Sequence, residues 1–159
     1  MTKRELQSYD RVSLAVVCVL LATTAGLKSV SAFGGGVILS VVDPVLLVQY
    51  RYSMLMSAGI EFAICAGILV GVIGTRVYSA VLLFCALVVW YRWASVQMEA
   101  PKACPCLGTF AGRIGIPDET ARYLASLVLV TLAVISAGGL CIHWFQLKRA
   151  SVQEDEIAI

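Results

Sequence analysis

Four long apolar runs, separated by shorter polar segments, dominate the pattern of hydrophobic and polar positions along the chain. Runs of about 20 apolar residues are typical of helices that cross a bilayer, because a helix satisfies its backbone hydrogen bonds internally. The pattern therefore predicts an all-α, polytopic membrane protein built as a bundle of four transmembrane helices. The predicted spans cover residues 12–33, 53–74, 77–95 and 123–145.

The polar and interrupted segments add detail to this bundle. Residues 37–50 are apolar but too short to cross, and Asp43-Pro44 interrupts them. Because Asp is a favourable helix N-cap and Pro fits the first turn, we expect a short interfacial helix after the first span. Residues 1–149 then form the transmembrane domain, and residues 150–159, with Glu154-Asp155-Glu156, are expected to be an acidic, solvated tail.

The first apolar run has a second interpretation. A basic start, an apolar stretch and small residues are also the pattern of a secretory signal peptide. The run is long enough to span, so we expect it to be retained, and removal of residues 1–25 stays as the alternative.

A stripe of small residues follows the second span at four-residue spacing: Gly59, Ala63, Gly67 and Gly71. Such stripes let another helix approach closely. We expect a packing face here, against a helix of the same chain or of another subunit.

Composition supports the membrane assignment and narrows the partners. The chain of 159 residues is 60% hydrophobic and only 14% charged, well below the charged fraction of a soluble domain. Its net charge is +2, and its twelve basic residues are scattered rather than clustered. Because nucleic-acid binding needs a concentrated basic surface, nucleic acid is not expected as a partner, and the lipid bilayer is.

Basic residues in the connections predict the orientation in a cell membrane. Six flank the spans on the side of the termini, Lys3, Arg4, Arg11, Arg76, Lys148 and Arg149, and four lie on the opposite side, Arg51, Lys102, Arg113 and Arg122. The excess predicts cytoplasmic termini for this multi-pass protein. The long connection between the third and fourth spans would then lie on the outer face.

Three ionisable residues fall inside the apolar runs, where charges are costly and are candidates for functional residues. At 1.5 Å per helical residue, Lys28, Glu61 and Arg92 lie about 8, 12 and 5 Å from the face that carries the long connection. The long side chains of Lys28 and Arg92 can also extend to the headgroups, whereas Glu61 needs a partner. We predict a Lys28–Glu61 pair between the first two helices. His143, at the far end of the fourth run, is interpreted as an interface residue.

The long connection holds two thiols one residue apart, Cys104-Pro105-Cys106. The other four cysteines fall one to each apolar run and are interpreted as small buried hydrophobes. A disulfide across one intervening residue makes a small ring, and departures from preferred geometry make a disulfide easier to reduce. The pair therefore predicts thiol–disulfide exchange, with one cysteine as attacking thiolate and the other as resolving thiol.

Two other interpretations of the pair remain open. The cysteines can form a fixed structural disulfide in the loop, or two thiolates can bind a soft ion such as Cu(I). Zinc is disfavoured because a closed zinc site takes four ligands, and no metal site is predicted. Besides the two cysteines, Met98 is the residue of this connection whose side chain carries a soft ligand atom.

The combination of motifs resembles a known family. A lysine ends the first span in Ala25-Gly26-Leu27-Lys28, a glutamate lies early in the second in Gly59-Ile60-Glu61, and Cys104-Pro105-Cys106-Leu107-Gly108 precedes the fourth. Over residues 11–146 this pattern is similar to the methylamine-utilisation MauE family, within the wider MauE/DoxX group of redox-associated membrane proteins. Pro105 and Leu107 depart from that family, where glycine and an aromatic residue are expected.

The resemblance implies a four-helix membrane bundle that assists disulfide formation or electron transfer for an exported protein. Cys104 and Cys106 would be the redox pair, and Lys28 and Glu61 the intramembrane charges. A thioredoxin-like or exported protein is the expected partner, and a quinone in the bundle is a candidate electron acceptor, although the sequence holds no quinone motif. Whether the protein is an enzyme stays open. The alternative is a non-catalytic scaffold or accessory subunit of an oxidoreductase, with Cys104–Cys106 as a structural disulfide.

Overall fold

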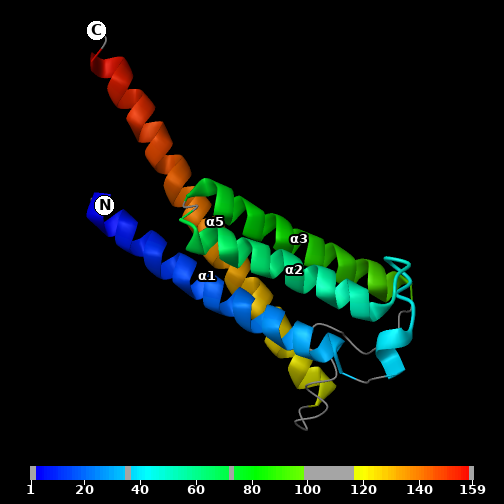
Figure 1. Ribbon diagram of the computed structural model, residues 1–159. Coiled ribbons are helices and arrows are strands. Elements are labelled where there is room, and N and C mark those ends of the chain that lie inside the picture. The colour runs from blue at the N-terminus through cyan, green and yellow to red at the C-terminus, as the bar shows by residue number, and fades with distance from the viewer. Residues whose placement is uncertain (1–2, 35–36, 72–73, 99–116, 158–159) are drawn as a thin grey trace.

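Four long helices form a bundle in the part of the chain that is described (Figure 1). The computed structural model describes residues 3–34, 37–71, 74–98 and 117–157. The helices are α1 (Lys3–Ala32), α2 (Tyr50–Leu69), α3 (Thr75–Gln97) and α5 (Asp118–Ile157). The all-α fold class is confirmed.

Each of the four helices is long and apolar enough to cross a membrane. The apolar stretches are Ser8–Ala32, Tyr50–Leu69, Thr75–Gln97 and Glu119–Gln146. At 1.5 Å per residue, the shortest helix, α2, rises about 30 Å, which matches the hydrocarbon thickness of a bilayer. The prediction of a multi-pass membrane protein with four spans is therefore confirmed.

The helices extend past several predicted ends, because hydropathy marks the apolar part of a span whereas the backbone hydrogen bonds continue into polar residues. Helix α2 is the exception at its C-terminal end, since it stops at Leu69 although its apolar pattern continues to residue 74. Gly71 has a φ of 88°, in the left-handed region, and its N–H donates to the carbonyl of Ile68 at 3.1 Å. Glycine in this conformation is a common helix terminator.

The segment between α1 and α2 differs in detail from the short interfacial helix that was predicted. A short helix is present, but it is the single 3-10 turn η1 (Val37–Ser40), before Asp43 rather than after it. Asp43 instead begins a turn, in which its N–H donates to the Val48 carbonyl at 2.7 Å. An isolated bridge between Val42 and Gln49 closes the segment and leaves no room for a helix beyond Pro44.

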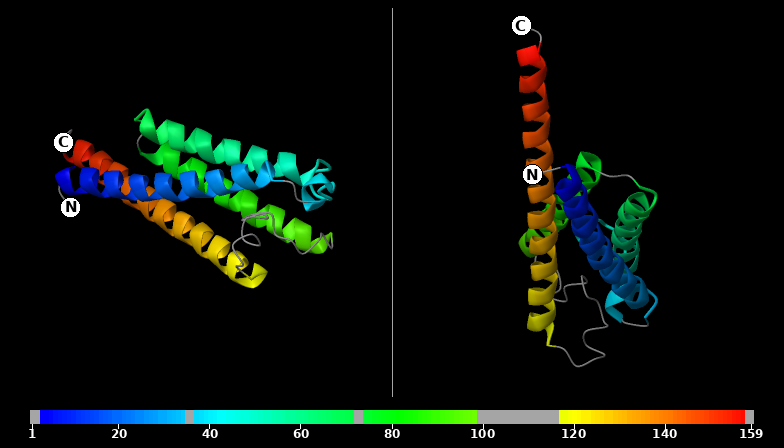
Figure 2. Two further views of the ribbon diagram at one scale, coloured as in Figure 1. Left: turned by 60° about the horizontal axis from the view of Figure 1, so that its bottom comes forward. Right: turned by 90° about the vertical axis from the view of Figure 1, so that its left-hand side faces the viewer.

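The helices pack as two close pairs, α1 with α2 and α3 with α5, whereas α2 and α3 make fewer contacts with each other. Figure 2 shows α5 crossing the bundle beside α1 and α3. The main core joins residues of all four helices: Leu14, Val17, Leu21, Cys65, Val77, Tyr78, Val81, Phe84, Cys85 and Leu132. Helix α1 supplies three of these, so it is an integral part of the bundle.

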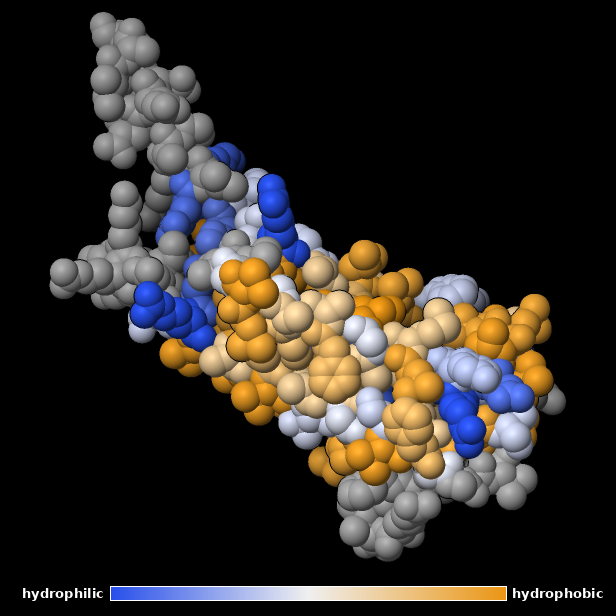
Figure 3. Space-filling model, in the orientation of Figure 1, coloured by the Kyte–Doolittle hydropathy of each residue, from blue (hydrophilic) through white to orange (hydrophobic). Residues whose placement is uncertain are grey.

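The outside of the bundle is also apolar. Hydrophobic residues cover most of the middle of the face shown in Figure 3. Val12, Leu83 and Leu127 are among the large hydrophobic residues exposed on the described helices. In water such a surface would be unfavourable, whereas in a bilayer it contacts lipid tails. The exposed apolar belt thus fits contact with a lipid bilayer.

Both chain ends lie toward the same end of the bundle, and α5 continues well beyond the other helices there (Figures 1 and 2). Its 40 residues rise about 60 Å, twice the hydrocarbon thickness. The segment predicted as a tail after residue 149 is helical as far as Ile157. The backbone of this acidic segment therefore continues α5.

Candidate functional site: a buried ion pair beside an apolar pocket

The predicted pair between Lys28 of α1 and Glu61 of α2 is present. Lys28 Nζ donates to Glu61 Oε1, and the two side chains are only 11% and 2% exposed. Lys28 lies one turn before the end of α1, and Glu61 lies three turns after the start of α2, near the middle of that helix. Because α1 and α2 are antiparallel neighbours, these two sequence positions meet at the same depth.

Two hydroxyl groups complete this site. Ser57 Oγ, one turn before Glu61 on α2, accepts from Lys28 Nζ at 2.8 Å. The Thr24 hydroxyl, one turn before Lys28 on α1, lies 3.0 Å from Glu61 Oε2 and can donate to it. Buried charges need both a counter-charge and hydrogen bonds to be tolerated. The sequence pattern identified Lys28 and Glu61, but the two hydroxyl partners are a further finding.

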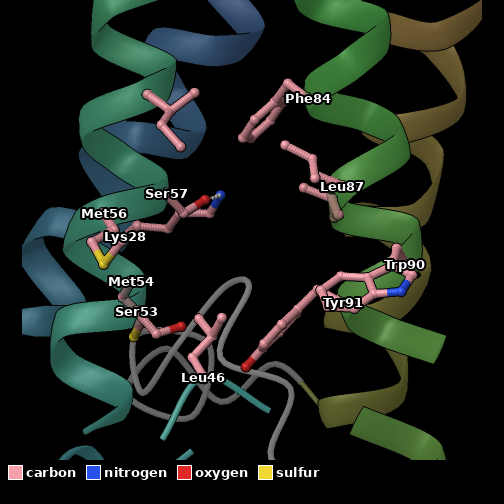
Figure 4. Close-up of a pocket in the computed structure, with 12 residues that line it drawn as sticks. Lys28, Leu46, Ser53, Met54, Met56, Ser57, Phe84, Leu87, Trp90 and Tyr91 are labelled. Carbon is pink, nitrogen blue, oxygen red and sulfur yellow. Dashed lines mark hydrogen bonds between the residues drawn. The ribbon is translucent and has the colours of Figure 1, made fainter. Parts of the chain in front are cut away.

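An apolar pocket of about 230 Å³ opens beside the ion pair, between α2 and α3 (Figure 4). Lys28 reaches its inner wall, and its Nζ lies 5.7 Å from the centre of the Phe84 ring. The other lining side chains come from the turn before α2, from α2 and from α3: Leu46, Ser53, Met54, Met56, Ser57, Ile60, Leu87, Val88, Trp90 and Tyr91. Several of these, including Met56 and Trp90, are also exposed on the outer surface, so the pocket faces the lipid.

The third predicted intramembrane charge, Arg92, makes a different contact. Its Nη1 donates to Ser126 Oγ of α5 at 2.9 Å. Arg92 therefore ties α3 to α5, whereas Lys28 and Glu61 tie α1 to α2. The structure brings Lys28 and Glu61 together. The Arg92 side chain instead points toward α5, where it donates its hydrogen bond to Ser126, and does not extend freely to the headgroups.

The predicted redox pair, Cys104 and Cys106, lies outside the described residues. The connection that carries the pair leaves α3 after Gln97 and joins α5 at Asp118. The pocket that Lys28 reaches extends toward the end of α3, because Trp90 and Tyr91 near that end also line it.

The four cysteines of the apolar runs have free thiols. Cys65 and Cys85 are buried in the core, and Cys18 is partly buried, as expected for small hydrophobes. Cys141 differs, because it is exposed on the outside of α5. The interpretation of Cys141 as a buried residue was therefore wrong, since its position on the helix faces away from the bundle.

A second polar cluster joins three helices near the end that carries the termini. The Tyr78 hydroxyl of α3 donates to Asp10 Oδ1 of α1 at 3.0 Å and lies 2.7 Å from Ser13 Oγ. His143 Nε2 of α5 lies 3.2 Å from Asp10 Oδ2, an ion pair when the imidazole is protonated. The expectation that His143 is simply an interface residue missed this cluster. Asp10, Tyr78 and His143 are far apart in sequence. The one sequence feature that could have indicated them is that each is a polar residue near the end of an apolar run.

Within the described ranges, no three His, Cys, Asp or Glu side chains gather in a way that could hold a metal ion. The Lys28 ammonium can act as a cationic hydrogen-bond donor toward the pocket.

The fold and the site together define a polytopic four-helix membrane protein with a hydrogen-bonded ion pair buried beside a lipid-facing pocket. Comparisons with protein-family models, with curated proteins and with solved structures found no match. The resemblance to the MauE/DoxX group therefore stays a prediction from the motifs.

Proposed function

We propose that this protein is a membrane-embedded thiol–disulfide redox protein, in which Cys104 and Cys106 exchange a disulfide with an exported or thioredoxin-like partner. The pair would accept two electrons and two protons from the partner's thiols and become a dithiol. In the reaction, a partner thiolate attacks one sulfur of the Cys104–Cys106 disulfide, and the mixed disulfide resolves when the second partner thiolate attacks it. The partner leaves oxidised, with its own disulfide.

The observation that best supports this proposal is the Lys28–Glu61 pair and its two hydroxyl partners. A buried ion pair is an expensive way to join two helices, because apolar residues of the same volume are often as stable or more stable there. Its place beside a pocket that extends toward the end of α3, where the Cys104–Cys106 connection leaves the helix, suits a role in chemistry rather than packing alone. Cytoplasmic termini, as the basic residues predict, would expose the pair to an oxidising compartment.

Trapping of a mixed disulfide tests the proposal. In membranes, Cys104→Ser and Cys106→Ser variants are incubated with a thioredoxin that keeps a single cysteine. This cysteine is activated as a mixed disulfide with a small aromatic thiol. One of the two variants should form a covalent complex much faster than the other, and its remaining cysteine is the one that forms the mixed disulfide with the partner. A variant with Cys18, Cys65, Cys85 and Cys141 replaced by alanine should react like the wild type.

The scaffold alternative predicts a different result. A structural Cys104–Cys106 disulfide would resist mild reduction, so neither thiol would become alkylatable in the native protein. Absence of alkylation at Cys104 and Cys106 after treatment with a small dithiol, together with full alkylation after unfolding and complete reduction, would reject the redox proposal. Binding of one Cu(I) per chain that disappears in Cys104→Ser would favour the metal interpretation instead.

A further inference from the structure

We infer that the pocket between α2 and α3 binds a neutral, planar, carbonyl-bearing lipophile of the quinone class, with Lys28 as hydrogen-bond donor to a carbonyl oxygen. The inference concerns only described residues, and its connection to electron transfer rests on the proposed function.

The size and lining of the pocket suit a ring. An apolar cavity of about 150 Å³ is enough to bind benzene, so a pocket of 230 Å³ can hold a substituted six-membered ring. Phe84, Trp90 and Tyr91 of α3 lie along one wall, opposite Met56 and other side chains of α2 (Figure 4). Aromatic side chains favour stacked or edge-on contacts with a planar ligand.

The pocket is accessible from the membrane. Met56 and Trp90 are 61% and 54% exposed, and Leu87 is 50% exposed on the same outer surface. Since α2 and α3 make fewer contacts than the other neighbouring helices in the bundle, the opening lies along a loosely packed seam. A molecule dissolved in the lipid can therefore enter sideways, whereas a water-soluble one would first have to cross the apolar surface.

Hydrogen-bond donors at the inner wall favour a ligand that carries an acceptor. An ammonium group has three N–H donors, and within the described residues Lys28 Nζ uses two of them, on Glu61 and Ser57. Ser57 Oγ accepts from Lys28 and so keeps its own hydrogen for another acceptor. An unsatisfied donor in apolar surroundings is costly, so a carbonyl oxygen placed there would gain a charge-assisted hydrogen bond.

Charge decides between a neutral and an anionic ligand. Lys28 already has a full counter-charge, because Glu61 is its ion-pair partner at 2% exposure. A carboxylate or phosphate ligand would therefore bring a net negative charge into an apolar pocket, at a high desolvation cost. A neutral carbonyl accepts the hydrogen bond without that cost.

The chemistry of such a ligand balances the proposed thiol reaction. When the dithiol formed from Cys104 and Cys106 closes again to a disulfide, two S–H bonds break, one S–S bond forms, and two electrons and two protons are released. A quinone that takes up the two electrons and the two protons becomes a quinol, with one O–H bond formed at each former carbonyl oxygen. The quinone is thus the oxidant that the cycle needs.

Quenching of tryptophan fluorescence tests the pocket directly. The purified full chain in detergent is titrated with decylubiquinone, with decylbenzene, which has the ring and tail but no carbonyl, and with decanoate, which is an anion. We expect saturable quenching by decylubiquinone, and no displacement of decylubiquinone by equal concentrations of either of the other two compounds. Trp90→Phe should remove most of the saturable quenching, whereas Trp144→Phe, at the far end of α5, should keep it.

Two variants separate binding from folding. Leu87→Phe adds bulk inside the pocket without touching the ion pair, and should raise the Kd at least tenfold. Leu83→Phe is its matched control, since Leu83 is exposed one turn earlier on α3 and does not line the pocket. The double variant Lys28→Met/Glu61→Leu, which removes both charges of the pair, should also raise the Kd at least tenfold. Equal Kd values for Leu87→Phe and Leu83→Phe, or displacement by decylbenzene at the concentration at which decylubiquinone binds, would overturn the inference and indicate an unselective lipid groove.

The outcome is distinguishable from that of the proposed function. A Cys104→Ser/Cys106→Ser variant should bind decylubiquinone with unchanged Kd, because the inferred contacts come from described residues of α1, α2 and α3. Tight binding in a protein whose thiols never become alkylatable would support the pocket and reject the redox function. Disulfide exchange in a protein that does not bind decylubiquinone would support the redox function and reject the pocket as a quinone site.

Discussion

Single side chains in the middle of this bundle are held by specific partners rather than by general apolarity. Lys28 and Glu61 are the clearest case, since each is buried and each is the other's counter-charge. Breaking a buried pair by removing one partner is far more costly than replacing both, because the remaining charge is left without compensation. The pair therefore makes a sharp prediction for stability.

Glu61→Gln should lower the free energy of unfolding by about 3–5 kcal/mol, because it leaves the Lys28 ammonium buried without a counter-charge. The double variant Lys28→Met/Glu61→Leu should recover most of that loss. Titration of the purified protein with SDS in mixed micelles measures both. Met56→Leu, at an exposed position on the same helix, is the control and should unfold like the wild type. Equal stability of the single and double variants would contradict the prediction.

Gly139 of α5 is required by the close approach of Tyr78. A Cβ at this position would come within 2.6–2.7 Å of three atoms of the Tyr78 ring, which is fully buried in the core. Gly138 is different, since a Cβ there would meet its nearest neighbour, Tyr9 Oη, at an ordinary 3.5 Å. Two adjacent glycines of one helix thus have opposite tolerance for a methyl group.

Gly139→Ala should therefore destabilise the bundle by about 1–3 kcal/mol through overpacking. Gly138→Ala should be neutral or stabilising by up to about 1 kcal/mol, because alanine is the better helix former. Unfolding of the two variants in the same SDS titration checks the difference in sign. A similar loss in both would mean that the general flexibility of the Gly-Gly pair, and not the Tyr78 contact, is what matters.

At the scale of the elements, the connection between α1 and α2 is anchored to α3 by one side-chain contact. The Tyr91 hydroxyl donates to Asp43 Oδ2, and Asp43 is fully buried. The other carboxylate oxygen accepts from the Val45 N–H at 2.9 Å, which forms the turn after Pro44. Asp43 thus stabilises a turn and attaches it to the helix that lines the pocket.

Tyr91→Phe should loosen this connection at a cost of about 1–3 kcal/mol, since it removes a donor from a buried carboxylate. Hydrogen exchange over residues 41–50 should accelerate, with the amides of Val45 and Tyr50 most affected. Tyr52→Phe, which removes an exposed hydroxyl, is the matched control. Unchanged exchange over this segment in Tyr91→Phe would show that the bridge between Val42 and Gln49 is sufficient to hold it.

The stripe of small residues predicted along α2 does not contact another described helix at its glycines. A Cβ added at Gly59 or Gly67 would meet no other atom of the described residues within 4 Å, so no described helix packs closely at these two glycines. Gly71 terminates the helix instead of extending the stripe. The expectation of a packing face within this chain is thus not met at these positions, and contact with another subunit stays as a prediction.

For the whole molecule, four spans require that both termini lie on one side of the membrane and Met98 on the other. In a background with all six cysteines replaced by alanine, single cysteines are introduced at Ser8, Met98 and Lys148, which are all exposed. An impermeant maleimide added to intact cells should label Met98→Cys, and should label the other two only after permeabilisation. This pattern follows from the excess of basic residues on the side of the termini.

Each possible deviation has a separate meaning in this experiment. Opposite labelling of Ser8→Cys and Lys148→Cys would contradict the four-span arrangement itself. Labelling of both from outside, with Met98→Cys protected, would keep the four spans but reverse the orientation. The second result would place Cys104 and Cys106 in a reducing compartment and so weaken the proposed redox function.

Much of the fold could be predicted from the sequence because a bilayer allows so few solutions. Apolar runs of sufficient length form helices there, and the charged residues within them must find partners. Lys28 and Glu61 could thus be matched by depth alone. The Asp10–Tyr78–His143 cluster and the Asp43–Tyr91 contact could not, because their residues are separated by 48 or more positions and lie near the ends of runs, where polar side chains need no partner.

The sequence by itself determined the four spans, the all-α class, the depth of Lys28 and Glu61 and the position of the Cys104–Cys106 pair in the long connection. Only the tertiary structure decided that Arg92 binds Ser126 of α5, that α2 ends at Leu69, and that a pocket opens beside Lys28. The physical reason is that hydropathy and helical rise fix where a residue lies along the bilayer normal. The direction in which a side chain points around its helix, and which helix it then meets, depends on how the four helices pack.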